Sequence, residues 1–286
     1  KSLRSQLEAT ARIDHLVQER TQVSKDRTTK YLFELEDGHF IETVLIPERG
    51  HFTLCVSSQA GCAMGCRFCL TARQGLKRNL TAAEIVDQVI HVKRSMSEPD
   101  RLTNIVFMGM GEPLANYDAV VRALGNLISE EGMNFSHRTV TLSTCGLVPQ
   151  IKRLGKQVRV NLAVSLNASD DETRSFLMPV NRKYSLKTLV EALKEFPILN
   201  RRMITFEYVL VGGINDRDED ADHQFDQAEA AHRRSWMLHD FSAQFPLILA
   251  TVTNWFAVLS PGICQLTVMV TWSPAITVVR LPLGKF

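Results

Sequence analysis

Apolar strand-like segments that alternate with amphipathic helical segments are the feature that most constrains this fold. The strand-like segments are nearly continuous apolar runs, as expected for parallel strands buried on both faces: 103–108, 138–142, 159–165 and 204–210. Between them, apolar residues recur at helical spacing. Strands that alternate with helices build a parallel sheet, either open or curled into a barrel. The sequence therefore predicts the α/β class.

The N-terminal residues precede this alternation. Residues 1–30 are polar and basic, and we expect a short helix that leads into a linker. Residues 31–47 alternate around the turn pair Asp37-Gly38, which predicts a β-hairpin. We therefore divide the chain into three parts: an N-terminal part over 1–50, a core over 51–217 and an anomalous tail over 218–286.

The tail differs in composition from the rest of the chain. Residues 241–279 contain no charged side chain and show no clear alternation of strands and helices. Their most apolar stretch, 246–260, is shorter than the roughly 20 residues that a transmembrane helix needs. It also contains Asn254 and lacks basic flanks. We therefore expect no membrane span.

Three cysteines lie within eight residues, in the array Cys62-Ala-Met-Gly-Cys66-Arg-Phe-Cys69. In a chain with no secretory signal pattern, such close spacing favours metal ligation over disulfides and a reducing, cytoplasmic setting. Three thiolates can hold three irons of a 4Fe–4S cube and leave the fourth iron open to S-adenosylmethionine (SAM). The alternative is zinc, but zinc usually takes four ligands, and no second Cys pair is present.

Polar residues follow three of the predicted strands at their carboxyl ends, where parallel sheets bind ligands. After 103–108 comes Gly109-Met110-Gly111-Glu112-Pro113, whose glycines would let backbone approach a ligand and whose Glu112 could accept from an ammonium group. Ser143 follows the second strand, and Ser165-Leu166-Asn167 ends the third. Each alone is equally consistent with a turn or a helix cap. Together with the cysteines they predict a SAM pocket.

The run from Cys55 to Cys69, Cys-Val-Ser-Ser-Gln-Ala-Gly-Cys-Ala-Met-Gly-Cys-Arg-Phe-Cys, resembles the signature of the RlmN/Cfr family of radical SAM adenine methyltransferases. Further similar stretches are Val106–Pro113, Ser143-Thr144, Ser165–Asn167 and Met178–Asn181. The resemblance covers roughly residues 30–217. It implies a radical SAM partial (β/α)6 barrel with a small N-terminal β-hairpin extension.

The resemblance also implies an activity, which is methylation of adenine C2 in 23S rRNA (adenine 2503) and in tRNA (adenine 37). Two SAM molecules are used per turnover. One methylates a cysteine near the C-terminus, and the second supplies the radical that activates this methyl group. A second cysteine then resolves the protein–RNA crosslink by forming a disulfide. A flavodoxin-type electron donor and a monomeric, cytoplasmic protein are expected as well.

The family's functional residues carry over by position. Cys62, Cys66 and Cys69 would ligate the cluster. The residues that would contact SAM are Gly111, Glu112, Ser143, Ser165, Leu166 and Asn167.

Three further residues depend on the resemblance for their interpretation. Cys55 matches the resolving cysteine, although by itself it would be a small buried strand residue. Glu42 matches the proton acceptor, although by itself it would be a solvent-facing hairpin carboxylate. Cys145 stands where the family commonly has Ser, and we expect it to be structural.

Two features depart from the family pattern. Residues 1–30 are too few for the N-terminal RNA-binding domain with which the family normally begins. After Asp216, the segment that should bear the methyl-carrying cysteine is absent, and Cys264 lies before the 267–270 run that should precede the carrier. We hypothesise a reading-frame shift near 218–240. Such a chain could bind a cluster but could not complete methyl transfer by the family's route.

The net charge of +2 gives no indication of RNA binding, so any such indication has to come from local clusters of basic residues. We expect Arg73, Lys77 and Arg78, just after the cysteine array, to contact phosphates. The other basic clusters fit solvated helix faces equally well: 152–159, 182–183 and 201–202. Two alternative functions stay open. One is another radical SAM enzyme, such as a C8 methyltransferase, a maturase or an activase; the other is a catalytically impaired RNA- or metal-binding protein.

Overall fold

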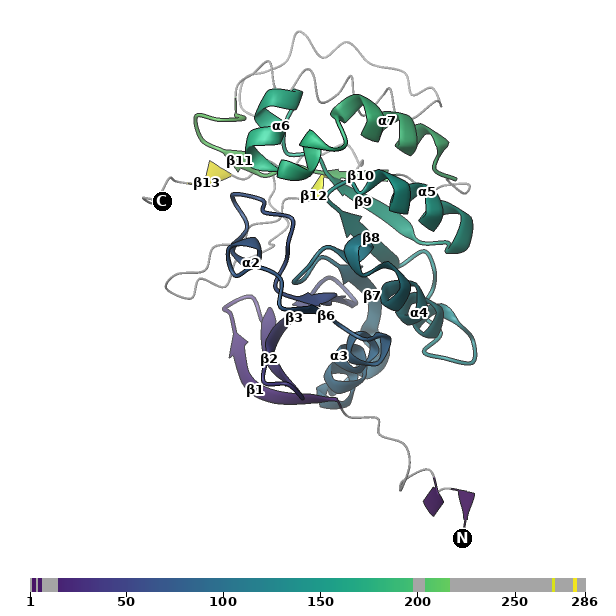
Figure 1. Cartoon of the computed structure of the whole chain (residues 1–286). Coiled ribbons are helices and arrows are strands. Elements are labelled where there is room, and N and C mark those ends of the chain that lie inside the picture. Colours follow the sequence, from purple (N-terminus) through teal and green to yellow (C-terminus); the bar gives the residue numbers. More distant parts are fainter. Residues whose placement is uncertain are drawn as a thin grey trace. The chain divides into compact units, whose positions relative to one another are not determined.

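The protein is described by a computed structural model that covers residues 2–3, 5–6, 15–197, 204–216, 269–270 and 280–281. At residues 210, 269–270 and 280–281 it describes the backbone alone. The chain forms two compact units (Figure 1). Unit 1 comprises Lys1–Ala63 and Thr71–Ser143, and unit 2 comprises Met64–Leu70 and Thr144–Phe286.

Unit 1 is built on a sheet in which an antiparallel meander joins parallel strands. The order is β1-β2-β3-β4-β7-β8. Strands β1 to β4 pair antiparallel in sequence, whereas β7 pairs parallel with both β4 and β8. The bounds are Leu16–Val23 (β1), Thr29–Leu35 (β2), Phe40–Pro47 (β3), Phe52–Cys55 (β4), Leu102–Phe107 (β7) and Val140–Thr144 (β8, whose last residue belongs to unit 2). A separate antiparallel ribbon pairs β5 (Gln59–Ala60) with β6 (Arg78–Asn79).

Two helices supply much of the apolar core of unit 1. Helices α3 (Ala82–Ser95) and α4 (Tyr117–Ile128) pack against each other. The predicted capping box of α3 is confirmed, because Thr81 Oγ1 accepts the Glu84 N–H at 3.2 Å while the Glu84 carboxylate accepts the Thr81 N–H at 2.8 Å. The buried apolar residues recur at the predicted helical spacing: Ile85, Val89, Val92, Val120, Leu124 and Leu127. The shorter elements are α2 (Leu70–Arg73, which begins in unit 2), η1 (Pro99–Arg101) and η2 (Pro113–Asn116).

Unit 2 repeats the strand–helix alternation. Strand β9 (Asn161–Ser165) pairs parallel with β10 (Ile204–Glu207), which pairs antiparallel with β12 (Met269–Val270). The other elements are α5 (Val148–Gln157), α6 (Asp171–Leu177), η3 (Pro179–Arg182), α7 (Leu186–Glu195), β11 (Leu210–Val211) and β13 (Arg280–Leu281). The parallel pairs in both units confirm the α/β class, and the strand bounds differ from the predicted ones by only a few residues.

The prediction of a helix and a linker over residues 1–30 is wrong for the second half of that segment. Residues 16–23 form β1, which pairs antiparallel with β2. The strand was missed because only Leu16 in it is buried, so its sequence carries no apolar alternation. Pairing with β2 stabilises it instead. The predicted hairpin is confirmed as β2 and β3, with Gly38 in the turn at φ +76°.

The membrane prediction is tested only in part. No helix in the described part of the chain has the length and hydropathy that a bilayer span requires. The stretch 246–260 lies outside the described residues.

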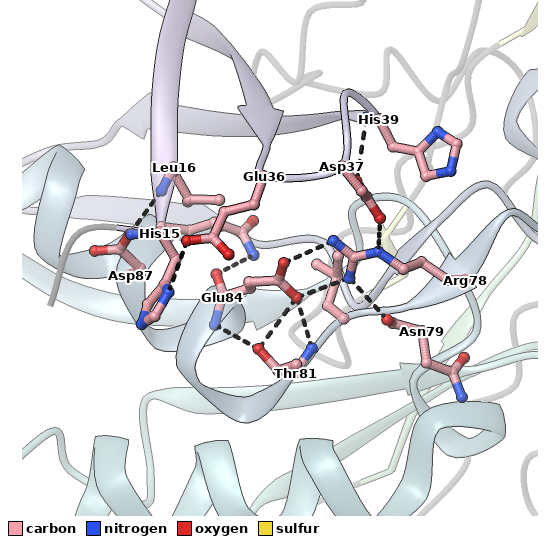
Figure 2. A network of polar contacts seen from close by, with 12 residues as sticks. His15, Leu16, Glu36, Asp37, His39, Arg78, Asn79, Thr81, Glu84 and Asp87 are labelled. Atoms are coloured by element: carbon pink, nitrogen blue, oxygen red, sulfur yellow. Dashed lines mark hydrogen bonds and ion pairs between the residues drawn. The ribbon is translucent and has the colours of Figure 1, made fainter. Parts of the chain in front are cut away.

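A network of polar contacts fastens the hairpin turn to the start of α3 (Figure 2). Arg78, in β6, donates to the Asp37 carboxylate in the turn between β2 and β3. The same guanidinium donates two hydrogen bonds to Glu84, at 2.7 and 2.9 Å. Such a two-point contact fixes direction as well as distance. Arg78 therefore connects the hairpin, the β5–β6 ribbon and the helix N-terminus.

The charges in this network shift the titration of both carboxyl groups. The hydrogen bond from Arg78 lowers the pKa of Asp37. Burial raises the pKa of Glu84, but the hydrogen bonds from Arg78 and Thr81 outweigh it and lower the pKa overall. Both carboxylates therefore stay ionised under conditions in which ordinary ones begin to protonate.

We expect Arg78→Met to reduce the free energy of unfolding by on the order of 1–3 kcal/mol at pH 7. Because Arg78 lowers both carboxyl pKa values in the folded state, its contribution is complete above the ordinary carboxyl range of about 4. It disappears as the pH falls through the lowered folded values. Urea unfolding of wild type and variant at neutral and acidic pH measures this difference.

Arg101→Met is the matched control, since Arg101 forms an exposed pair with Glu98 and should contribute less. A difference between wild type and R78M that stays constant from pH 7 to pH 3 would contradict the ion-pair explanation.

Candidate functional site

The first cysteine of the array follows a closely packed turn in unit 1. Gly61, at φ +77°, directly follows strand β5, and a Cβ there would lie 1.9 Å from the carbonyl oxygen of Gly75. No side chain fits in that space. Lys77 N–H also donates to the Ala60 carbonyl at 2.8 Å, so the chain before Cys62 is held against the segment that leads into β6. Cys62 itself is buried.

The other two cysteines lie in the loop of unit 2 that precedes α2. The Cys69 N–H donates to the Cys66 carbonyl at 3.1 Å, which closes a tight turn. Arg67 N–H donates to the Leu177 carbonyl at the end of α6, at 2.9 Å. Cys66 and its neighbour Phe68 pack against a small apolar cluster. The members of that cluster are Cys145, Leu177 and Met178.

The donor set fits a 4Fe–4S cluster, although the structure does not present it as an assembled metal site. Among the described residues, no group of three or more His, Cys, Asp or Glu side chains is placed to hold a metal ion. The array does supply three thiols at a spacing suited to three irons, from loops that are anchored by backbone hydrogen bonds. The described part of the chain shows no disulfide.

In unit 1, the predicted glycine loop after β7 packs against the segment after β4. A Cβ on Gly109 would lie 2.8 Å from the Val56 carbonyl oxygen, and one on Gly111, at φ +102°, would lie 2.5 Å from the Gln59 Cβ. We expected these glycines to admit a ligand. In the structure, the chain's own residues 56–59 occupy the space that side chains would fill.

Hydrogen bonds join the same two segments. Ser58 N–H donates to the Met110 carbonyl at 2.8 Å, and Met110 N–H donates to the Ser57 hydroxyl at 2.8 Å. The Gln59 side-chain carbonyl accepts the Glu112 N–H at 2.8 Å. Parallel neighbours β4 and β7 are thereby connected beyond the ends of their ladder. This connection holds Glu112 in place.

Glu112 and Ser143 are both buried in unit 1. The Glu112 carboxylate accepts the Leu114 N–H at 3.0 Å and so caps the short helix η2. The cap explains the position of Glu112 without any ligand. Contacts of Glu112 and Ser143 with SAM stay predictions.

In unit 2, the end of β9 is enclosed by hydrogen bonds. Ser165 Oγ donates to the Glu207 carboxylate at 2.7 Å, and Leu166 N–H donates to the Glu207 carbonyl at 2.9 Å. Asn167 adopts φ +58°, a left-handed conformation that Asn tolerates better than most residues. Its side-chain oxygen accepts the Val209 N–H at 2.8 Å. The predicted triplet Ser165-Leu166-Asn167 is therefore a rigid turn.

Two polar residues of this strand end were missed by the sequence reasoning. Glu207 is a buried acid at the end of β10, and Asn215 is fully buried. The Asn215 amide donates to the Asn167 and Val209 carbonyls, each at 2.8 Å. An acid within the apolar run 204–210 was the available signal for Glu207.

The two predicted catalytic residues lie on one face of the sheet of unit 1. Cys55 in β4 is directly opposite Val44 in β3, and Glu42 is two residues from Val44, so Glu42 and Cys55 point to the same side. Both are half-buried. Lys30, in β2, forms an ion pair with Glu42 at 2.9 Å. The structure thus places Glu42 beside a cation, in neither a fully exposed nor a fully buried position.

One residue of the predicted phosphate-binding cluster, Arg78, forms ion pairs within unit 1. Arg78 is engaged by the Asp37 and Glu84 carboxylates within unit 1, whereas Arg73 and Lys77 have exposed side chains. RNA contact by this cluster stays a prediction, and Arg73 and Lys77 are its exposed members. Residues 201–202 lie outside the described residues.

The model of the radical SAM superfamily matches residues 56–225, which include the cysteine array and the strand ends. The chain belongs to the radical SAM superfamily. A 4Fe–4S cluster and SAM are therefore its implied cofactors. Site residues named above for these groups are consistent with this family, but their individual roles stay predictions.

Two curated relatives bear the name dual-specificity RNA methyltransferase RlmN. The one from Syntrophobacter fumaroxidans is 56% identical over 221 residues, which cover 77% of this chain and 65% of that protein. The one from Geobacter sulfurreducens is 57% identical and is covered to 60% of its length. The chain thus spans less than two thirds of either relative. These similarities confirm the predicted resemblance to the RlmN/Cfr family.

A solved structure agrees with this assignment. The crystal structure of a radical SAM methyltransferase from Sphaerobacter thermophilus is 46% identical in sequence and superposes with a TM-score of 0.75. The similarity covers 79% of this chain and 67% of that one. Cys264 and nearly all of the anomalous tail lie outside the described residues, so what we predicted for them stays a prediction.

We expect Gly111→Ala to destabilise the protein by about 2–4 kcal/mol, because alanine is strained at the φ of +102° found here and its Cβ collides with Gln59. Thermal or urea unfolding measures the loss. Gly125→Ala is the matched control, since a Cβ on this exposed α4 residue meets no other atom within 4 Å. That control should be stabilising by about 0.5–1 kcal/mol. Equal effects of the two substitutions would show that residues 56–59 are not tightly packed against Gly111.

Proposed function

We propose that residues 30–217 carry the SAM-cleaving core of an RlmN-type RNA methyltransferase, with adenine C2 in 23S rRNA and tRNA as the substrate position. The observation that carries this proposal is 56–57% identity to two RlmN relatives. It is supported by the cysteine array, with Cys62 after a closed glycine turn and Cys66 and Cys69 in an anchored loop.

Each set of residues has a separate part in the proposed reaction. Cys62, Cys66 and Cys69 hold the cluster, which when bound supplies the electron for reductive cleavage of SAM. The backbone at Gly111 and Glu112 and the side chains of Ser143, Ser165 and Asn167, with Leu166, orient SAM. In these loops, hydrogen bonds within the chain fix the positions of the residues before any ligand binds, which lowers the entropy cost of binding.

Glu42 and Cys55 would act later in the family's complete reaction, on the protein–RNA crosslink. Glu42 would take the proton from C2 of the crosslinked adenine at its carboxylate. The Cys55 thiolate would attack the sulfur of the methyl-carrying cysteine, so that the S–S bond forms while the bond from that sulfur to the RNA-linked carbon breaks. The released electron pair is protonated, which leaves the methyl group on adenine C2. Their shared face on β3 and β4 supports this pairing of roles. Lys30 offers a positive charge next to the Glu42 carboxylate. The carrier cysteine is not recognisable, and we propose that a reading-frame shift near 218–240 removed it.

The proposed partners follow from the same similarity. RNA phosphates would meet Arg73 and Lys77, which are exposed and follow the cysteine array in the sequence. A flavodoxin-type protein would deliver the electron to a monomeric, cytoplasmic enzyme.

Anaerobic reconstitution with iron and sulfide tests the core of the proposal. We expect wild type to bind about four irons per chain and to release 5′-deoxyadenosine from SAM under strong reductant. Cys62→Ala, Cys66→Ala and Cys69→Ala should each abolish the release. Cys145→Ser is the matched control and should retain iron and SAM cleavage, because Cys145 is outside the array. Zinc or no metal in wild type, with SAM intact, would refute the proposal.

The RNA product separates the remaining alternatives. Mass spectrometry of 23S rRNA and tRNA fragments should show no methyl transfer by this chain if the carrier cysteine is lost. Mass spectrometry of the reconstituted protein should then show no methylated cysteine. C2-methyladenosine would instead show that the tail supplies a working cysteine. Methylation at C8, or cleavage of SAM coupled to another substrate, would favour a different radical SAM enzyme.

Substitution of the two later-acting residues should leave the first step unchanged. We expect Glu42→Gln and Cys55→Ser to release 5′-deoxyadenosine at the wild-type rate, since neither residue holds the cluster or SAM. A parallel assay with Cys66→Ala gives the background. A rate reduced tenfold or more in E42Q or C55S, with iron content unchanged, would place that residue in SAM binding instead.

A further inference from the structure

Arg174, in helix α6 of unit 2, is a large charged side chain that is fully buried. Its hydrogen-bond partners in the described structure are neutral oxygen atoms. A buried guanidinium without a directly bonded carboxylate is costly, because its hydration is lost and no opposite charge replaces it. Neither the family resemblance nor the sequence reasoning assigned Arg174 a role.

The guanidinium binds the backbone at two predicted functional segments. Its Nε donates to the Leu166 carbonyl at 2.9 Å, and one Nη donates to the Ser165 carbonyl at 3.1 Å. The same Nη donates to the Cys145 carbonyl, directly after β8, at 2.8 Å. One planar side chain thus fixes the chain after β8 relative to the end of β9. An ammonium or a neutral side chain cannot reproduce this fork.

The surroundings of Arg174 hold its side chain in this position. Its other Nη donates at 2.8 Å to the side-chain oxygen of Asn181. The Asn181 amide in turn donates to the Asp171 carboxylate at 2.8 Å and to the Ser175 hydroxyl at 2.9 Å. Gly146, at φ +108°, leaves room for the Arg174 guanidinium, because a Cβ on Gly146 would lie 3.3 Å from an Arg174 nitrogen. The orientation of Arg174 is therefore determined before any ligand is bound.

The same side chain lies close to the cysteine loop. One carbonyl that it binds belongs to Cys145, a member of the apolar cluster against which Cys66 packs. Helix α6, which carries Arg174, also accepts the Arg67 N–H at its last residue, Leu177. Burial lowers the pKa of Arg174 to about 10, with nearby Cys145, Cys66 and Asp171 acting in the opposite direction. The guanidinium therefore remains charged at neutral pH.

We propose that Arg174 is a positioning residue that sets the SAM-binding turn at Ser165-Leu166 and places a fixed positive charge at Cys145, in the apolar cluster against which the predicted cluster ligand Cys66 packs. This inference rests on the proposed function. The fork would hold the turn in the geometry that binds SAM. The charge would raise the reduction potential of the cluster, because it favours the more negative, reduced form.

Two variants separate the fork from the charge. Arg174→Lys keeps the charge and removes the fork, whereas Arg174→Met removes both at similar length. We expect the dissociation constant of SAM to rise about tenfold or more in each variant, as outer contacts of a metal site typically change affinity. The midpoint potential should stay near the wild-type value in R174K and become more negative in R174M. Equilibrium dialysis and redox titration followed by electron paramagnetic resonance measure the two quantities in reconstituted protein.

Leu193→Ala is the matched control for lost stability, because Leu193 is fully buried in α7 of the same unit and is not one of the predicted site residues. It should lower the thermal unfolding temperature of the protein without changing the dissociation constant of SAM or the midpoint potential. If R174K and R174M change neither SAM affinity nor potential more than L193A does, the inference is wrong. If R174M fails to fold, the SAM affinity of R174K alone decides it.

A different result would refute the underlying function instead. If wild-type protein binds no cluster and cleaves no SAM, the proposed function fails, whatever the variants do. If wild type is active and the Arg174 variants match L193A, the function stands and only the role of Arg174 is refuted.

Discussion

The contact of residues 56–59 with the glycine loop 109–112 is the constraint on which the site in unit 1 depends. Backbone meets backbone there at distances that exclude a side chain on Gly109 or Gly111. The contact extends the β4–β7 pairing beyond the strands and brings Ser57, Ser58 and Gln59 against the loop that holds Glu112. The cysteine array begins three residues later. Cys62, the first cysteine of the array, is thus positioned by sheet packing and not by the loop alone.

Much of this arrangement could be predicted from the sequence, because it depends on local signals. The Thr81–Glu84 capping box, the Asp37-Gly38 turn and the apolar strands each have a short-range pattern, and all three were found in the structure. The cysteine array indicated its chemistry through spacing, and the radical SAM match agrees with it. These features need no knowledge of distant contacts.

The features that were missed depend on residues far apart in the chain. Strand β1 has an exposed sequence and exists because β2 offers a pairing edge. The packing role of Gly111 is visible only once Gln59 is placed beside it. The ion pairs of Arg78 with Asp37 and Glu84 likewise have no local sequence signal. In the same way, no local pattern shows that Arg174 is buried among carbonyl oxygens.

The Arg78 ion pairs have a consequence for experiments that vary salt. Because Arg78 and Asp37 are partly exposed, dissolved ions screen their attraction, with a Debye length of about 10 Å at 0.1 M. Added salt also weakens RNA binding by reducing the gain from released counterions. For the proposed RNA substrate, the slope of affinity against salt would then combine phosphate contacts with loosening of the hairpin turn. A count of phosphate contacts taken from that slope alone would be too high.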